Sequence, residues 1–455
     1  MENIKSNQTK PQNKMGVMPI NKLLISMSAP MMVSMLIQAL YNVVDSIFVS
    51  HITNDGLPFS ALNLSFPIQS LMIAVSVGTG VGVNALLSRK LGAKDYDGAN
   101  ELARTGVFLA FCSYLLFLIA GIFVVRPFFE MQTDNVQIIE YGVQYLTICM
   151  VGSFGLFFQI MYERLMQSTG KTIYVMFTQG TGALINIIFD PIFIFGCKMG
   201  VVGAALATIL GQIVAMCLAI FIHHKLNKEV SVDYKKVFTP GLKTVGAIYA
   251  VALPSIVMQS IGSIMVFLLN KILLTFDEMA TNVFGAYFKL QSFVFMPVLG
   301  LNNGMVPIIS FNYGARNKQR IVKTVKLAVV YALAIMTVGM LLIQIFPKQL
   351  LLLFNADAML IERGTVALRI ISTHFVLAAV CIVFSSVFQA MGKAVRSMIV
   401  SVCRQLVVLV PVAFLFSLTR NVNNVWWAFP AAEVVSLAMC VGFYLNIYNK
   451  IIKKI

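Results

Sequence analysis

The chain has 455 residues, of which 58% are hydrophobic and only 11% charged, and its mean hydropathy is +0.84. Such an apolar composition excludes a water-soluble globular protein, because most of the length cannot face water. The formal net charge of +16 fits basic loops on one side of a membrane, with attraction to anionic lipid, better than nucleic-acid binding. The composition therefore predicts an integral membrane protein.

Twelve apolar stretches follow one another along the chain. A membrane span needs about 20 mainly apolar residues, and short charged or Pro/Gly-containing breaks separate the stretches. The predicted spans are 28–50, 59–87, 101–125, 137–161, 172–196, 201–223, 244–274, 281–309, 324–346, 358–388, 396–418 and 424–447. The predicted fold class is an all-α integral membrane protein with twelve transmembrane helices.

Two short motifs recur 222 residues apart. Residues 88–94 are SRKLGAK and residues 310–316 are SFNYGAR, while QSTGK at 167–171 recurs as QAMGK at 389–393. Two windows that share one offset indicate an internal repeat. Because each half holds an even number of spans, both halves cross the membrane in the same orientation. The repeat predicts two parallel six-helix lobes around a central cavity.

Lys and Arg set the predicted orientation and the domain limits. Most of the 34 basic residues lie on one side if both termini are cytoplasmic, as the positive-inside rule requires. The first residues lack the order of a cleaved signal peptide. The predicted units are a cytoplasmic tail (1–27), an N-lobe (28–225), a cytoplasmic linker (226–243), a C-lobe (244–448) and a basic cytoplasmic tail (449–455).

Catalytic and metal-binding motifs do not emerge from the sequence. The seven Cys fall in or beside apolar spans without C-x-x-C spacing and are expected to be small buried hydrophobic side chains. The four His show no metal-binding spacing. Without a P-loop or G-x-S-x-G motif, nucleotide-driven pumping is unsupported. We expect neither an enzyme nor a protein with a cofactor.

Carboxylates within predicted spans are the most informative side chains. An ionised Asp at the centre of a membrane helix costs about 2.5 to 3.5 kcal/mol, so Asp45 and Asp190 are functional candidates. Each lies on a polar stripe of an otherwise apolar helix, at i, i+3, i+4 or i+7 spacing. The stripes comprise Gln38, Tyr41, Asn42 and Asp45 in the first span and Gln179, Asn186 and Asp190 in the fifth. Both stripes are predicted to face a cavity.

Depth in the membrane groups four oxygen-bearing side chains. At about 1.5 Å per residue, Asp45, Asn186, Asp190 and Thr208 lie at similar depths in the outer halves of their spans. Two carboxylates in low dielectric cannot both ionise cheaply, so the group suits a shared proton or a sodium ion. The alternative, that both Asp residues only hydrogen-bond neighbouring helices, stays open.

Several longer motifs resemble those of the multidrug and toxic compound extrusion (MATE) family, in a bacterial branch. They are Pro30 with QALYNVVD at 38–45, RKLGA at 89–93, NIIFDPIFIFG at 186–196, GAALAT at 203–208 and YFKLQSF at 287–293. The resemblance implies two lobes, alternating access and export of organic cations or amphipathic drugs in exchange for protons or sodium. It also implies a cation site in the first lobe, at Asp45, Asn186, Asp190 and Thr208. We expect a monomer in the bacterial plasma membrane.

The second half lacks the polar partners of this group, so ion coupling is predicted to be confined to the first lobe. Glu433 is its buried acidic candidate, predicted to pair with Lys289, with Arg369 as a competing partner and a structural role as the alternative. Glu163, beside Arg164, is interpreted as a gate or topology residue. Pro30 is the predicted hinge. The predicted substrate contacts are Gln38, Tyr41, Asn42, Gln179, Tyr287, Phe288, Lys289, Gln291, Phe293, Met296 and Glu433.

Two rival functions remain open on sequence alone. A lipid-linked oligosaccharide flippase would share the two-lobe shape but should carry more basic residues in its cavity, where only Lys289 and Arg369 qualify. A membrane-embedded enzyme could use Asp45 and Asp190 as an aspartyl pair, although twelve repeated spans argue against it. The sequence also leaves open whether protons or sodium ions drive transport.

Overall fold

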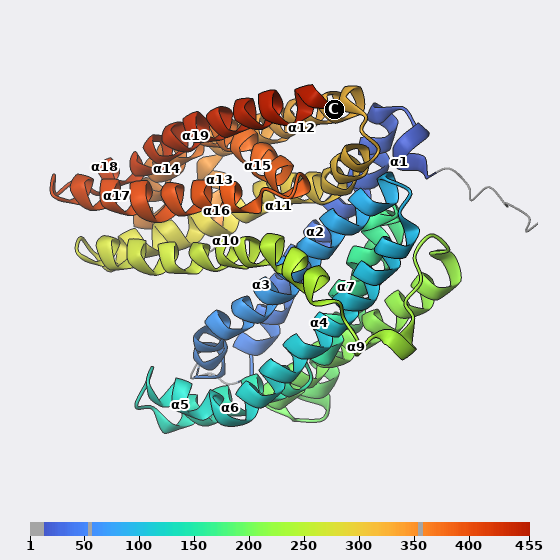
Figure 1. Cartoon of the computed structure of the whole chain (residues 1–455). Coiled ribbons are helices and arrows are strands. Elements are labelled where there is room, and N and C mark those ends of the chain that lie inside the picture. The colour runs from blue at the N-terminus through green and yellow to red at the C-terminus, as the bar shows by residue number, and fades with distance from the viewer. Residues whose placement is uncertain (1–12, 53–56, 354–357) are drawn as a thin grey trace, which may run out of the picture.

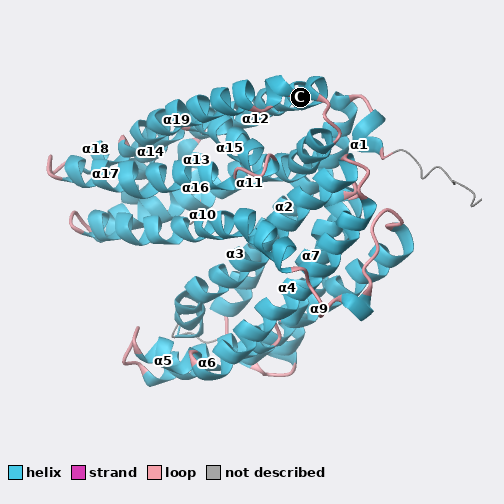
Figure 2. Ribbon diagram, viewed as in Figure 1, coloured by secondary structure: helices cyan, strands magenta, loops and turns pink. Residues whose placement is uncertain are grey.

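The computed structural model describes residues 13–52, 57–353 and 358–455, without the side chains of Asn42, Val43, Ser46 and Ser50. All regular secondary structure in these ranges is helical (Figure 2). Ten of the described helices are long and apolar enough to cross a membrane, and two bent helix pairs pass the same test together. These elements coincide with the twelve predicted spans, so the predicted fold class is confirmed.

The first half of the chain runs from α1 to α9. Its elements are α1 (Lys14–Val17), α2 (Ile20–Ser50), α3 (Leu57–Gly92), α4 (Tyr96–Phe123), α5 (Val125–Glu130), α6 (Val136–Val151), α7 (Phe154–Ser168), α8 (Thr172–Pro191), the π-helix η1 (Ile192–Gly196) and α9 (Gly200–Leu226). The first span starts at Ile20, eight residues ahead of the predicted limit. The preceding segment is held by Arg320, which donates to the carbonyl oxygens of Met15 and Met18 at 2.9 and 2.8 Å.

The second half runs from the linker to the C-terminus. Its elements are η2 (Tyr234–Lys236), α10 (Leu242–Leu274), α11 (Glu278–Gly314), α12 (Lys318–Ile345), α13 (Pro347–Leu352), α14 (Ala358–Ser372), α15 (Phe375–Ala390), α16 (Ala394–Val402), the π-helix η3 (Cys403–Leu409), α17 (Val410–Ser417), α18 (Val422–Trp426), α19 (Ala428–Lys450) and η4 (Ile452–Lys454). The linker packs on α4, where Phe238 lies edge-on to Phe108 and Phe111.

Two predicted spans are bent where the sequence suggested continuous helices. α6 and α7 meet at an angle of 43°, and α14 and α15 at 48°. The breaks fall at Gly152 and Ser153 in the first half and at Thr373 and His374 in the second. Because Gly152 and His374 are 222 residues apart, the bend belongs to the repeated unit.

Backbone conformation repeats with the same period. Six of the seven described residues with a positive φ form three pairs, each 222 residues apart: Lys94 with Arg316, Gly170 with Gly392, and Lys198 with Arg420; the seventh is Gly200. A positive φ is uncommon outside glycine, so its recurrence at matched Lys and Arg positions indicates that both halves turn their chains in the same way.

The halves form two helical bundles that meet at one end and diverge at the other (Figure 1). Gly78 and Gly82 of α3 face α10, and their repeat partners Gly300 and Gly304 of α11 face α2. An added Cβ at Gly300 would lie 2.5 Å from the Cα of Met32. Small residues four apart let helix backbones approach closely in membranes. The interface between the lobes is therefore built twice, from two matching glycine pairs.

The lobes also approach each other closely where α3 and α11 end in basic turns. A Cβ at Gly92 would collide with the carbonyl oxygen of Phe311, and a Cβ at Gly314 with that of Arg89. The Arg89 guanidinium also lies over the Tyr313 ring, 4.4 Å from its centroid. This end of the molecule is consequently closed by direct backbone packing.

Candidate functional site

A buried polar cluster lies between α8 and α9 in the first lobe. Asp190 and Asn186 are 0% and 2% exposed, one helical turn apart on α8. The Asn186 amide is satisfied when its nitrogen donates to Asp190 Oδ2 at 3.0 Å and its oxygen accepts from the backbone N–H and hydroxyl of Thr208 at 3.2 and 3.3 Å. Three of the four predicted coupling residues therefore form one hydrogen-bonded group.

Local helix packing explains this arrangement. α8 and α9 touch at Gly182 and Gly211, where a Cβ on Gly211 would lie 2.6 Å from the Gly182 carbonyl oxygen. Asn186 is one turn from Gly182, and Thr208 is one turn from Gly211, so the glycine contact brings their side chains together. Pro191 then ends the regular helix because it lacks an N–H, and the π-helix η1 follows. π-turns inside helices often lie at functional sites.

Asp45 completes the cluster from α2. Its carboxyl group lies close enough to that of Asp190 to share a hydrogen bond, while its buried Oδ1 has no hydrogen-bond partner among the described residues. The Tyr41 hydroxyl lies within hydrogen-bonding reach of Thr208. Two carboxylates at this separation repel unless a proton or cation lies between them.

The chemistry of these donors favours a hard cation. Carboxylate, amide and hydroxyl oxygens suit hard cations rather than transition metals. The described part of the chain holds no group of three or more His, Cys, Asp or Glu side chains that could bind a metal ion. Asp45, Asn186, Asp190 and Thr208 are thus suited to a proton or a sodium ion.

Two further polar residues near Asp45 were missed by the sequence analysis. The Tyr145 hydroxyl of α6 accepts a hydrogen bond from Gln69 of α3 at 3.0 Å, and it interacts with Asp45 and Tyr41. Gln69 and Tyr145 lie on other helices than Asp45, so spacing along one helix did not link them to the cluster.

Gln179 belongs to a separate network. Its amide nitrogen donates to Glu163 Oε2 at 2.7 Å, and its oxygen accepts from the Ser34 hydroxyl. Glu163 is buried and also accepts from Thr178 and Gln159 at 2.9 and 3.0 Å. The structure therefore joins Gln179 to Glu163 rather than to the Asp190 cluster that the predicted stripe suggested.

Two other predicted residues of α2 are Gln38, which is partly buried, and Pro30, which lies between Ser28 and Met32. Ser28 contacts Gly304 of the other lobe, and Met32 contacts Gly300. The side chain of Asn42 lies outside the described residues. The predicted hinge position is thus directly at the interface between the lobes.

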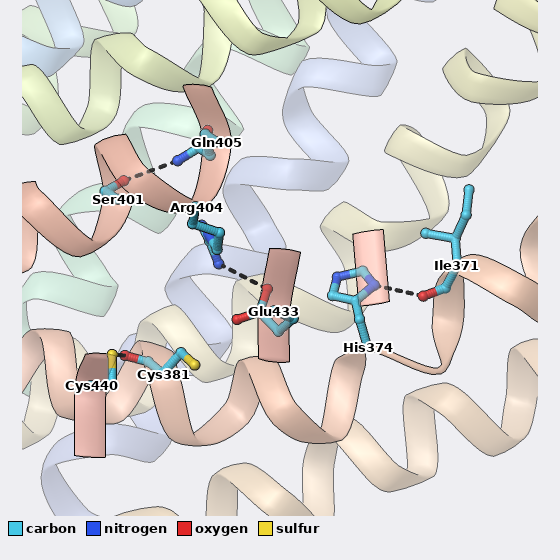
Figure 3. Close-up of polar contacts among 8 residues, drawn as sticks. All are labelled: Ile371, His374, Cys381, Ser401, Arg404, Gln405, Glu433 and Cys440. Atoms are coloured by element: carbon cyan, nitrogen blue, oxygen red, sulfur yellow. Dashed lines mark hydrogen bonds and ion pairs between the residues drawn. The ribbon is translucent and has the colours of Figure 1, made fainter. Parts of the chain in front are cut away.

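In the second lobe, the ion-pair partner of Glu433 is Arg404, where the sequence predicted Lys289 or Arg369. Arg404 Nη1 lies 3.4 Å from Glu433 Oε2, and the two side chains point toward each other (Figure 3). Lys289 and Arg369 are at exposed positions. The two predicted partners belong to the eighth and tenth spans, whereas Arg404 lies in the eleventh, at the repeat partner of Gly182, which faces α9 in the first lobe.

A cavity of about 240 Å³ opens beside this ion pair. It is lined by Gly262, Met265, Phe288, Gln291, Ser292, Phe295, Met296, Leu299, His374, Arg404, Gln405, Leu409, Phe429, Ala432 and Glu433. Phe288, Gln291, Met296 and Glu433 were among the predicted substrate contacts. Lys289 and Phe293 are exposed and outside this lining. Tyr287 is buried behind the cavity wall, its ring centroid 5.6 Å from that of Phe429.

Two parallel six-helix repeats with a polar site inside one lobe define a class of membrane protein, the secondary transporters built from internal repeats. The family model described as MatE matches residues 30–192 and again 254–415, one match in each lobe. The chain belongs to the MATE family of membrane transporters.

Similar proteins are consistent with this assignment. The multidrug export protein MepA of Staphylococcus haemolyticus is 27% identical over 95% of both chains, and MepA of Staphylococcus aureus is 25% identical over 94% of both. A solved outward-facing multidrug resistance MATE transporter is 26% identical, with a TM-score of 0.92 over 98% of this chain and all of the other. A MOP superfamily transporter from Pyrococcus furiosus is 25% identical, with a TM-score of 0.87 over 97% and 98%.

Proposed function

We propose that this MATE transporter exports organic cationic or amphipathic drugs in exchange for a proton or sodium ion bound at Asp45, Asn186, Asp190 and Thr208. The observation that carries the proposal is the pair of facing carboxylates on α2 and α8. Export of drugs is supported by the printed names of the MepA relatives. The coupling ion neutralises the carboxylate pair.

The cycle depends on α2, because this helix takes part in both the cation site and the lobe interface. An ion between Asp45 and Asp190 draws α2 toward α8. The same helix contacts Gly300 and Gly304 of the second lobe. Within this interface contact Pro30 removes one helical hydrogen bond, to the carbonyl of Ser26, so α2 can bend there. Ion binding thereby changes the contact between lobes and releases the substrate.

The orientation of this cycle follows from charge. The closed end of the molecule carries basic turns that include Arg89, Lys90 and Arg316. We place this end in the bacterial cytoplasm, by the positive-inside rule. The conformation described here is then outward-facing, with substrate release and ion entry on the external side. The protein acts as a monomer in the plasma membrane.

The test is drug efflux in proteoliposomes that contain this chain alone. A pH gradient and a sodium gradient are imposed separately, and export of the permanent cation ethidium is followed by fluorescence. We expect one gradient to drive export and the Asp45→Asn and Asp190→Asn variants to lose this response. Unchanged gradient-driven export in both variants would reject the first-lobe site. Asp233→Asn in the linker is the matched control, because that carboxylate is exposed.

A further inference from the structure

We propose that the cavity of the second lobe is a binding site for aromatic zwitterions, in which Arg404 binds an anionic group and Glu433 a cationic group. The inference rests on the proposed export function and names a substrate class for it. Its basis is a comparison of matched positions in the two lobes, together with the unsatisfied polar atoms of the cavity.

Arg404 and Glu433 replace two glycines of the first lobe. Gly182 and Arg404 are 222 residues apart, as are Gly211 and Glu433. In the first lobe the two glycines let α8 and α9 touch. In the second lobe the same two positions carry long charged side chains that form an ion pair. One helix contact of the repeated unit has thus become a charged pair beside a cavity.

The fold does not need this ion pair to join the two helices. Glycines at the matched positions of the first lobe make the same junction without a polar group. A buried ion pair also gives little net stability, because the cost of desolvating two charges offsets their attraction. A binding role explains why charges lie at these two positions.

Unused hydrogen-bonding capacity shows which ligand groups would fit. Glu433 is 3% exposed, and its Oε1 has no hydrogen-bond partner in the part of the chain that the structure describes. An ammonium group would satisfy it. A guanidinium has five N–H donors, and within the described residues that of Arg404 hydrogen-bonds Glu433 alone. Its remaining donors suit a carboxylate, which guanidinium groups bind in a bidentate manner.

The walls of the cavity suit an aromatic ligand. Phe288, Phe295 and Phe429 line it together with Met265 and Met296. Aromatic rings stack on planar ligands, and Met side chains adapt to ligands of different shape. The volume of about 240 Å³ is slightly below the usual range for drug-sized ligands. The cavity therefore suits a compact zwitterion or one ring system of a larger one.

Nearby groups leave the ion pair accessible. His374 also lines the cavity, but its Nδ1 donates to the carbonyl oxygen of Ile371 at 2.6 Å. Gln405 donates to the Ser401 hydroxyl at 2.9 Å. Figure 3 shows these two contacts on either side of Arg404 and Glu433. The ion pair thus supplies the Lys, Arg, Asp or Glu side chains among the residues that line the cavity.

The experiment compares two ligands that differ in one charge. Ciprofloxacin carries a carboxylate and an ammonium group on an aromatic scaffold, and its methyl ester keeps the ring and the ammonium group only. Binding to the purified full-length chain is measured by ligand fluorescence at pH 7. We expect the acid to bind about tenfold tighter than the ester, as expected for loss of one charge-assisted contact.

Variants of the two charged residues test whether the preference for the acid arises in the cavity. Arg404→Gln should weaken binding of the acid to the level of the ester, and Glu433→Gln should weaken both ligands. The double variant R404Q/E433Q leaves no unpaired charge, so it tests binding if a single variant does not fold. It should lose the preference for the acid. Arg369→Gln, an exposed Arg in the same lobe, is the matched control and should keep it.

The outcome separates this inference from the proposed function. If the double variant prefers the acid as strongly as the natural chain, or if the natural chain shows no preference, the zwitterion site is rejected. Gradient-driven ethidium export in the natural chain would still stand. Conversely, absence of any gradient-driven export would reject the proposed function, while an acid preference lost in the double variant would still support the binding site.

Discussion

The two lobes contain matching pairs of helices, but the residues at the contact between the two helices differ. In the first, Gly182 and Gly211 close the contact between α8 and α9, and a cluster of oxygen atoms with two carboxylates lies one turn away. In the second, Arg404 and Glu433 occupy the matched positions, and a cavity lies beside them. The first-lobe cluster thus holds two acidic groups and no basic one, while the two charges of the second-lobe pair cancel.

The comparison separates the framework that the two halves share from the polar side chains that differ between them. The positions at which the lobes agree are turns, bends and interface glycines, such as Gly78 with Gly300. The positions at which they disagree carry the polar side chains of the two candidate sites. Duplicated helices therefore supply the scaffold of a transporter, and the chemistry of each lobe comes from a few substitutions inside it.

The largest expected effect is the difference in stability between a variant that neutralises one residue of the Arg404–Glu433 pair and a variant that neutralises both. Arg404→Gln alone leaves Glu433 buried without its partner, which costs about 3–5 kcal/mol. R404Q/E433Q removes both charges, so its stability should return to within about 1 kcal/mol of the natural chain. The measurement is the unfolding midpoint in detergent. Equal destabilisation by the single and double variants would mean that the pair is needed for packing.

The matching change in the first lobe should act on transport more than on folding. In Asp190→Asn the side chain keeps its shape, but the carboxylate pair loses one charge and its affinity for a cation. We expect gradient-driven export to fall by about ten- to a hundredfold, the range that losing a supporting ligand contact costs. Export measured beside Asp233→Asn provides the check, and retention of more than a tenth of the natural rate would contradict the expectation.

Most of this framework could be predicted from the sequence because the prediction depends on many residues at once. Twelve apolar stretches and a fixed repeat offset define spans and lobes, and neither depends on a single residue. The cluster of Asp45, Asn186, Asp190 and Thr208 could also be predicted, since helical spacing and depth place them together. That they lie together is confirmed by the geometry, while their role in ion coupling stays a prediction.

What the sequence could not predict depends on contacts between distant spans. Arg404 and Glu433 lie on different helices, so spacing along one helix does not pair them. Tyr145 was missed because its significance comes from Asp45 on another helix. Gln179 fits the stripe of Asp190 by spacing, yet its depth places it next to Glu163. In all three cases the partner of the residue is set by contacts between helices in the folded protein.

Gly211→Val would break the glycine contact that distinguishes the first lobe. The Cβ of the new Val would lie 2.6 Å from the Gly182 carbonyl oxygen. α8 and α9 must therefore separate, and Asn186 must move away from Thr208. Overpacking of this kind costs about 1–3 kcal/mol, and the coupling ion should bind more weakly. Gly442→Ala on α19 is the control, because no atom lies within 4 Å of its added Cβ. Equal unfolding midpoints and ion affinities for both variants would show that the glycine contact is dispensable.

The smallest effect concerns Ser34, which connects α2 to a network that the second lobe lacks. Its hydroxyl donates to Gln179, which in turn donates to Glu163 at 2.7 Å, whereas the repeat partners of Gln179 and Glu163 are Ser401 and Ser385. Ser34→Ala should cost about 0.5–1.5 kcal/mol of stability. Ser26→Ala on the same helix removes a hydroxyl that bonds only its own helix, at the carbonyl of Leu23, and should cost less. Because Ser34 lies one turn beyond Pro30, a change in export rate for Ser34→Ala without one for Ser26→Ala would show that bending of α2 depends on this first-lobe network.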